Sequence, residues 1–196
     1  MFEQDEYTGE TFNRLDAPGI EVGEVSFYEC VFDGCTFREA QFKRCKFHEC
    51  TFRQCDLSLM DVTDCSFIDA QFQDSQVIGV NWALALWEKA GFLNSVAFKG
   101  CALTYSTFIG LTLHEVKIVD CVARDVDFSE AVVKEADFSG TDLSESRFMG
   151  TDLSGADLSK ARNYTIDATQ NTLKGVKFSL PEAMSLLYSL DIVIGE

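Results

Sequence analysis

A large apolar side chain recurs at every fifth position through most of this 196-residue chain. One unbroken run leads from Val22 to Trp82, and a second leads from Phe98 to Leu158 with Ala123 as its one small member. A period of five fits neither the 3.6-residue turn of a helix nor the two-residue repeat of a flat strand. The sequence therefore predicts a backbone that turns a corner every five residues.

A second position, two residues before each large one, is filled mostly by Cys, Ser, Thr, Ala or Val, and all eight cysteines occupy it. Two of every five side chains would then point inward, and four corners would close a square coil of twenty residues. Residues twenty apart would stack about 4.8 Å from one another. We therefore expect one column of rings through Phe32, Phe52 and Phe72. Each buried ring contributes about 1.5–3 kcal/mol.

The segments DFSGTDLS (137–144) and TDLSGADLS (151–159) match the consensus A(D/N)Lxx. On these motifs the chain resembles the pentapeptide-repeat family, and the resemblance extends over nearly its whole length. It implies an all-β fold, a right-handed quadrilateral parallel β-helix with a short C-terminal helix. One solenoid is expected over 1–178, interrupted by a connector or loop at 83–97.

The cysteines could be structural, or they could form disulfides or a metal site. Four pairs lie twenty apart and should stack: Cys30 and Cys50, Cys35 and Cys55, Cys45 and Cys65, Cys101 and Cys121. Parallel Cβ vectors disfavour disulfides, and no CxxC spacing suggests zinc. We interpret the cysteines as small buried hydrophobic residues, with no metal and no cofactor.

The five-residue frame breaks between Trp82 and Phe98, which are sixteen residues apart. Good helix formers from Ala83 to Ala90 indicate a short helical turn or a loop here. The segment could simply connect two stacks, which is the interpretation favoured for Trp82 and Trp87. Loops on a rigid scaffold also make contacts, and the candidate contact residues are Glu88, Lys89, Phe92 and Asn94.

Residues 179–196 depart from the repeat. Ser179 and Glu182 are spaced as a capping box, which predicts a helix to about Ser189 and then a short strand over 191–194. This segment could cap the last coil. It also resembles the tails of Qnr-type gyrase-protecting members and of albicidin and microcin immunity proteins, which implies a tail-to-tail homodimer. The expected dimer residues are Met184, Leu186, Leu187, Leu190, Ile192 and Ile194.

The net charge is −16, from 32 acidic and 16 basic residues. Such a surface should repel nucleic acid and anionic membranes and attract proteins with basic grooves. No apolar stretch approaches the roughly 20 residues that span a bilayer. The acidic N-terminus lacks the features of a signal peptide, so a cytoplasmic location is expected.

Acidic residues are concentrated in residues 120–157, where only Arg124, Lys134 and Arg147 oppose them. All are expected to face outward: Asp120, Asp125, Asp127, Glu130, Glu135, Asp137, Asp142, Glu145, Asp152 and Asp157. Duplex DNA is also a rod of regular negative charge. Together with the resemblance, this implies a DNA mimic that binds a type II topoisomerase and protects DNA gyrase or topoisomerase IV from quinolones or peptide toxins. A simpler explanation is that the Asp side chains bond to turn backbone.

The sequence predicts no enzyme. His48 and His114 each follow a core residue and should lie outside and far apart, and no catalytic motif is present. The alternative function is a non-enzymatic scaffold or adaptor with an unrelated protein partner.

Overall fold

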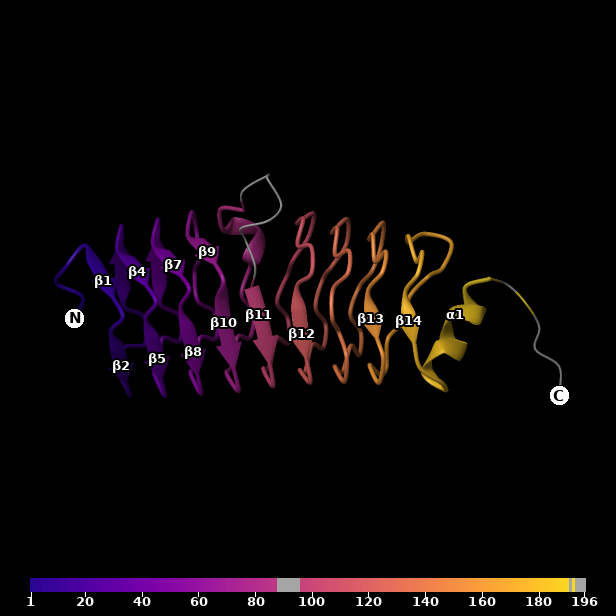
Figure 1. The fold of residues 1–196 in the computed structure, drawn as a ribbon, viewed down its shortest axis with the longest axis horizontal. Helices are drawn as coiled ribbons and strands as arrows, with labels where there is room; N and C mark the ends of the chain where they lie inside the picture. Colours follow the sequence, from indigo (N-terminus) through magenta and orange to yellow (C-terminus); the bar gives the residue numbers. More distant parts are fainter. Residues whose placement is uncertain (88–95, 191, 193–196) are drawn as a thin grey trace.

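The computed structural model describes residues 1–87, 96–190 and 192. They form a straight rod of short parallel strands, with the N-terminus at one end and helix α1 at the other (Figure 1). The strands are β1 Glu6–Thr8, β2 Thr11–Asn13, β3 Glu21–Gly23, β4 Ser26–Tyr28, β5 Val31–Asp33, β6 Gln41–Lys43, β7 Lys46–His48, β8 Thr51–Arg53, β9 Ser66–Ile68, β10 Ala70–Gln73, β11 Val96–Lys99, β12 Lys117–Val119, β13 Asp157–Leu158 and β14 Lys177–Phe178. The helical turns are η1 Trp82–Leu84, η2 Glu182–Met184 and α1 Ser185–Tyr188.

The rod has four sides, which we call faces A to D in chain order. Face A contains the sheet β1-β4-β7-β9, and face B contains the sheet β2-β5-β8-β10-β11-β12 and continues into β13-β14. Face C is a row of isolated parallel bridges from Asp16 to Arg162, and face D combines β3-β6 with bridges from Gln41 to Arg147. The sheets and bridges join residues twenty apart over most of the chain, as in the pairing of Phe32 with Phe52. The predicted solenoid is confirmed.

Aromatic columns fill the interior of the rod. Phe52 lies 4.8 Å from Phe32 and 4.9 Å from Phe72 between ring centroids, with nearly parallel planes, so this predicted column is confirmed. A second column runs through Phe27, Phe47 and Phe67, with centroid distances of 5.1 and 5.2 Å. These rings are fully buried. They therefore supply much of the apolar burial that drives folding.

The narrow position of the repeat holds the cysteines, and all eight are buried, unpaired thiols. The Cys50 thiol donates to the carbonyl of His48 at 3.4 Å and to that of Phe27 on the preceding coil at 3.3 Å. Burial raises the pKa of Cys50 to about 12. The thiol therefore stays protonated and acts as a compact donor between coils.

One coil is six residues longer than the others. Phe52 pairs with Phe72 across twenty residues, whereas Phe72 pairs with Phe98 across twenty-six. In the described part of the expected helical segment, which ends at Trp87, the helical turn is Trp82–Leu84, and the Asn81 side chain caps it by accepting the Ala83 N–H at 3.1 Å. The expected contact residues Glu88, Lys89, Phe92 and Asn94 lie outside the described residues.

Both tryptophans belong to the stack and not to an exposed loop. Trp82 is fully buried and stacks on Phe108 at 6.0 Å between centroids. Trp87 packs against the core, and its indole Nε1–H donates to the Trp82 carbonyl at 2.8 Å. Because Leu86 bridges to Ser66 on face A, the coil keeps the regular path at least as far as Leu86.

The predicted capping box at the C-terminus is wrong. The Ser179 hydroxyl accepts the N–H of Lys160 on the preceding coil at 3.1 Å, and Pro181 precedes the helix without a side-chain cap. The helical segment is only η2 followed by α1, which ends at Tyr188. Leu186 packs against the core, so the segment covers the last coil. The expected strand over 191–194 lies outside the described residues except for Ile192.

None of the helices in the described ranges is long and apolar enough to cross a membrane.

Candidate functional site

The four edges of the solenoid, where one face turns into the next, share an unusual backbone. The residue two after a core position adopts a positive φ in most turns of the chain, and this occurs at nineteen non-glycine residues and ten glycines. In this left-handed conformation an L-residue with a side chain costs roughly 1–2 kcal/mol. Glycine avoids that cost and is the residue that the edge geometry favours.

The edge positions carry most of the net negative charge. Thirteen of the nineteen non-glycine residues are acidic and three are basic, a net of −10 in a chain of net charge −16. The acids are Glu24, Glu29, Glu39, Glu49, Asp64, Asp69, Asp74, Glu115, Asp120, Asp125, Glu130, Glu135 and Glu145. All are exposed except Asp125, which is half-buried. Backbone conformation does not explain this choice, because glycine would be less strained at these positions.

The edge between faces A and B is the most acidic. It carries Glu29, Glu49, Asp69, Glu115 and Glu135, and the other described residues at this position are glycines. Neighbouring coils place successive acids about 4.8 Å apart. The four edges differ in net charge. The B/C edge carries two acids, Asp74 and Asp120, and two basic residues, Arg14 and Lys160, so its positive-φ positions have no net charge.

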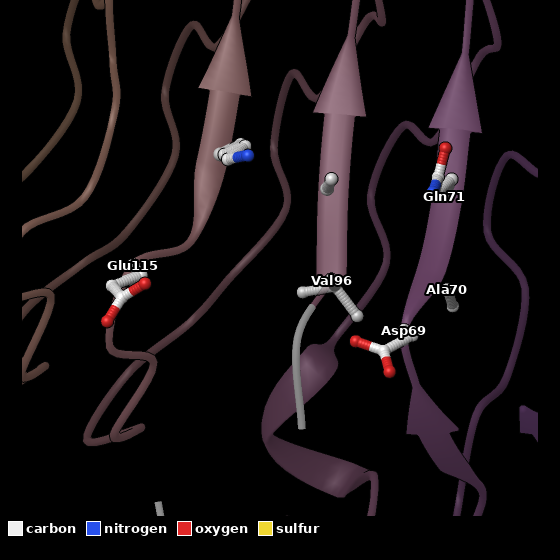
Figure 2. Close-up of a pocket in the computed structure, with 7 residues that line it drawn as sticks. Asp69, Ala70, Gln71, Val96 and Glu115 are labelled. Atoms are coloured by element: carbon white, nitrogen blue, oxygen red, sulfur yellow. The ribbon is translucent and has the colours of Figure 1, made fainter. Parts of the chain in front are cut away.

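Asp69 and Glu115 are the acids of this edge on either side of the longer coil. The edge position between them lies outside the described residues. Figure 2 shows the two carboxylates flanking the start of β11 at Val96, beside a hollow of about 270 Å³. Among the described residues, the acids of this edge form an N-terminal group from Glu29 to Asp69 and a C-terminal group of Glu115 and Glu135.

A second set of acids lies on the faces, directly before a core residue, and has a structural role. Each accepts the backbone N–H two residues later, as Asp127 does from Ser129 at 2.9 Å and Asp157 from Ser159 at 2.8 Å. The same bond forms at Asp137, Asp142 and Asp152. The simpler explanation given for these aspartates is therefore confirmed.

Four of these five face aspartates are also paired with a cation. The N···O distances are 3.3 Å for Asp127–Arg147, 2.8 Å for Asp142–Arg124, 3.2 Å for Asp152–Lys134 and 3.3 Å for Asp157–Lys177. Most of the charge on these five aspartates is thus locally compensated. Of the thirteen edge acids, Glu24 and Glu39 form ion pairs, with Arg44 and Arg38, and these are exposed.

Asp142 was expected to face outward, and that prediction is wrong. Its side chain is only 3% exposed, and it accepts hydrogen bonds from Arg124 and, at 2.9 Å, from the Asn163 amide. The cause is a break in the repeat, because Asn163 sits at a core position but turns outward with positive φ while Tyr164 fills the interior. Burial by itself would raise the pKa of Asp142, but the hydrogen bonds from Asn163, Ser144 and Arg124 hold it well below its usual range.

This carboxylate should make the stability of the protein sensitive to acid. Its pKa is depressed in the folded state, so its contribution is complete above the unfolded pKa of about 3.9 and is lost as the pH falls below that value. We expect the urea midpoint of Asp142→Asn to fall less between pH 5 and pH 2 than that of the native protein. Asp137→Asn, which removes a carboxylate with the same turn bond from the more open face B, is the control. An equal acid response of the native protein and Asp142→Asn would contradict the assignment.

The ten acids predicted from residues 120–157 do not share one face. The structure divides them among the four edges and the four faces. Glu130, Glu135 and Glu145, for example, lie on the D/A, A/B and C/D edges. The prediction missed the N-terminal half of the acidic edges, such as Glu29 and Glu49. A signal was available, since the residue two after each core position is so often acidic.

The C-terminal end of the rod exposes apolar side chains. Of the expected dimer residues, Met184, Leu190 and Ile192 are exposed, whereas Leu186 and Leu187 are partly buried. Ile194 lies outside the described residues. Leu180 and Tyr188, which the sequence analysis did not select, are the most exposed at 76% and 79%. An exposed apolar cluster of this kind suits contact with another protein surface.

Comparison with known proteins matches the family description "pentapeptide repeat region" to residues 25–96 and 92–178. Among solved structures, the chain is similar to QnrB1, described as a plasmid-mediated fluoroquinolone resistance protein. One trypsin-treated variant gives a TM-score of 0.72 at 23% identity, covering 97% of both chains. Another gives 0.64 at 21%, covering 97% of this chain and 99% of QnrB1, and the full-length form gives 0.59 at 19%, covering 95% and 100%. At these identities the likeness establishes the fold. No curated protein matches the sequence.

Proposed function

The chain belongs to the pentapeptide-repeat family, and from this premise we propose that it binds a type II topoisomerase by presenting its acidic edges in place of DNA. The observation that carries the proposal is the net charge of −10 at positions where folding favours glycine. In this role the protein is a cytoplasmic binding protein without catalysis. It contacts neither nucleic acid nor a membrane.

The dimensions of the rod support this proposal. Nine core residues stack along face B: Phe12, Phe32, Phe52, Phe72, Phe98, Ile118, Phe138, Leu158 and Phe178. Eight steps of about 4.8 Å give a length of about 38 Å. Acids recur along the edges with this spacing. A groove lined by Lys and Arg for the phosphates of a duplex could therefore pair with several edge carboxylates at once.

We propose further that two chains join through their C-terminal ends, which doubles the rod and places the acidic coils 120–157 on both sides of its centre. The support is the exposed apolar cluster of Leu180, Met184, Tyr188, Leu190 and Ile192. A homodimer would bury this cluster and would also cover the open end of the solenoid.

Leu190→Arg is expected to convert the dimer to monomers, because it places a charge in the centre of the proposed apolar interface while leaving the solenoid core untouched. Sedimentation velocity at micromolar protein checks the mass. Thr172→Arg, at an exposed position on the outer side of face A in the last coil, is the control and should remain dimeric. A native protein that sediments as a monomer would contradict the dimer, independently of topoisomerase binding.

A supercoiling assay with purified DNA gyrase tests the proposed function. The protein at micromolar concentration should either preserve supercoiling in the presence of a fluoroquinolone or compete with DNA and inhibit the reaction. The proposal would be wrong if the protein neither preserved nor inhibited supercoiling and bound neither gyrase nor topoisomerase IV. A pull-down that recovers another protein without topoisomerase subunits would then favour the adaptor function.

A further inference from the structure

Face D exposes apolar side chains in its C-terminal half, between two acidic edges. Ile109 and Met149 point outward from this face, with exposed fractions of 44% and 57%. The bridges Thr107↔Asp127 and Asp127↔Arg147 hold their coils in register, which separates the two side chains by about 10 Å along the rod. Ser129 occupies the equivalent position on the coil between them. Its small side chain therefore leaves a depression between the two larger apolar side chains.

Tyr105 adds an aromatic ring at the C/D edge of this surface. It has φ of 63° and is 67% exposed. A bulky aromatic residue is an outlier in the left-handed region, and this ring gains little from the core. Backbone strain of this type is typical of residues that take part in binding another molecule.

Two adjoining hollows mark the surface. One, of about 390 Å³, is lined by residues that include Tyr105, Ile109 and Asp125. The other, of about 490 Å³, is lined by residues that include Asp125, Glu145 and Met149. Arg147 borders both, and it pairs with Asp127.

The remaining acids leave the surface negative. Asp125 and Glu145 lie on the C/D edge and Glu130 lies on the D/A edge, and none of the three is in an ion pair within the described chain. Apolar anchors surrounded by uncompensated acids are complementary to a basic protein surface that carries an apolar or aromatic side chain of its own. A nucleic acid or an anionic membrane would be repelled.

We propose that face D between Tyr105 and Met149 is the principal docking surface for the basic DNA-binding region of the topoisomerase, with Tyr105, Ile109 and Met149 as its apolar anchors. This inference rests on the proposed function and identifies the side of the rod that makes the contact. The anchors hold one orientation of the rod, a property that charge distributed over several edges would not provide.

The test measures the Kd for purified DNA gyrase at several salt concentrations. The double variant Tyr105→Gly/Met149→Ser leaves the net charge unchanged. It is expected to bind at least tenfold more weakly at every salt concentration, with the same slope of log Kd against log salt as the native protein. The control Leu59→Gly/Val122→Ser also replaces a positive-φ apolar residue and an exposed face residue, but both lie outside the docking surface. It should stay within twofold of the native Kd.

The outcomes separate the two proposals. If the native protein binds gyrase and the double variant binds within twofold of it, the docking surface is overturned and the proposed function stands. If the native protein does not bind at all, the proposed function fails and this inference fails with it. Thermal melts verify the fold; if the double variant melts early, Met149→Ser alone is measured, and it must weaken binding at least threefold to support the surface.

Discussion

Phe52→Asp is expected to abolish the folded solenoid. The ring is 1% exposed and lies within 5 Å of Phe32 and Phe72 between centroids. Removing a buried Phe costs about 3–5 kcal/mol, and an unpaired carboxylate in its place adds several more. The total is comparable with the 5–15 kcal/mol that stabilises a typical domain. Far-UV circular dichroism should show loss of the β signal at room temperature.

Gln54→Asp is the matched control for this variant. It introduces the same residue two positions later, at an exposed edge position with φ of 50°, where five aspartates already occur in the chain. It should melt within a few degrees of the native protein. A Phe52→Asp variant that melts equally high would show that the ring column does not hold the coils together.

The variant Glu130→Gly/Glu135→Gly/Glu145→Gly is expected to lose most of its effect on gyrase without losing stability. Each glycine enters a positive-φ position and removes about 1–2 kcal/mol of backbone strain, which offsets the entropy that glycine adds to the unfolded chain. The charge on the C-terminal acidic coils changes by three. We expect at least tenfold weaker binding and a shallower dependence of log Kd on log salt.

The N-terminal half of the chain provides a matched control in Glu24→Gly/Glu29→Gly/Glu39→Gly. These residues occupy the same three edges five coils away, with the same positive φ and the same change of charge. Because the proposed contact lies near the centre of the dimer, this control should weaken binding far less. Equal loss in both variants would mean that overall charge, and not the C-terminal coils, determines binding. A fall in the melting temperature of the C-terminal variant would contradict the argument that the edges favour glycine; the N-terminal control also loses the exposed ion pairs of Glu24 with Arg44 and of Glu39 with Arg38.

The interior of the solenoid was predictable because a large apolar residue recurs at every fifth position of the sequence. The positions of Phe32, Phe52 and Phe72 required only that the same spacing be maintained over several coils. The same reasoning placed the cysteines in the core, since they share one position of the repeat.

The edges were not predictable from the period alone. It identifies which side chains point inward, but it does not reveal that the residue two after each core position has positive φ. The charge at Glu130 or Glu145 therefore looked like ordinary surface charge. Asp142 was misplaced because the turn at Asn163, on the next coil, covers it. Ser179 was misassigned because its hydroxyl bonds to Lys160 on the neighbouring coil, a contact that no local motif encodes.

The longer coil between faces A and B has a consequence for how such proteins diversify. Six additional residues enter between Trp87 and Phe98, yet β10 and β11 remain paired from Ala70↔Val96 to Gln73↔Lys99. An edge of the rod can thus accept new sequence without any adjustment in the coils before or after it. Binding segments could therefore be inserted at a chosen coil along the rod and exchanged for one another. New binding specificities could be engineered in this way while the paired strands of the solenoid stay the same.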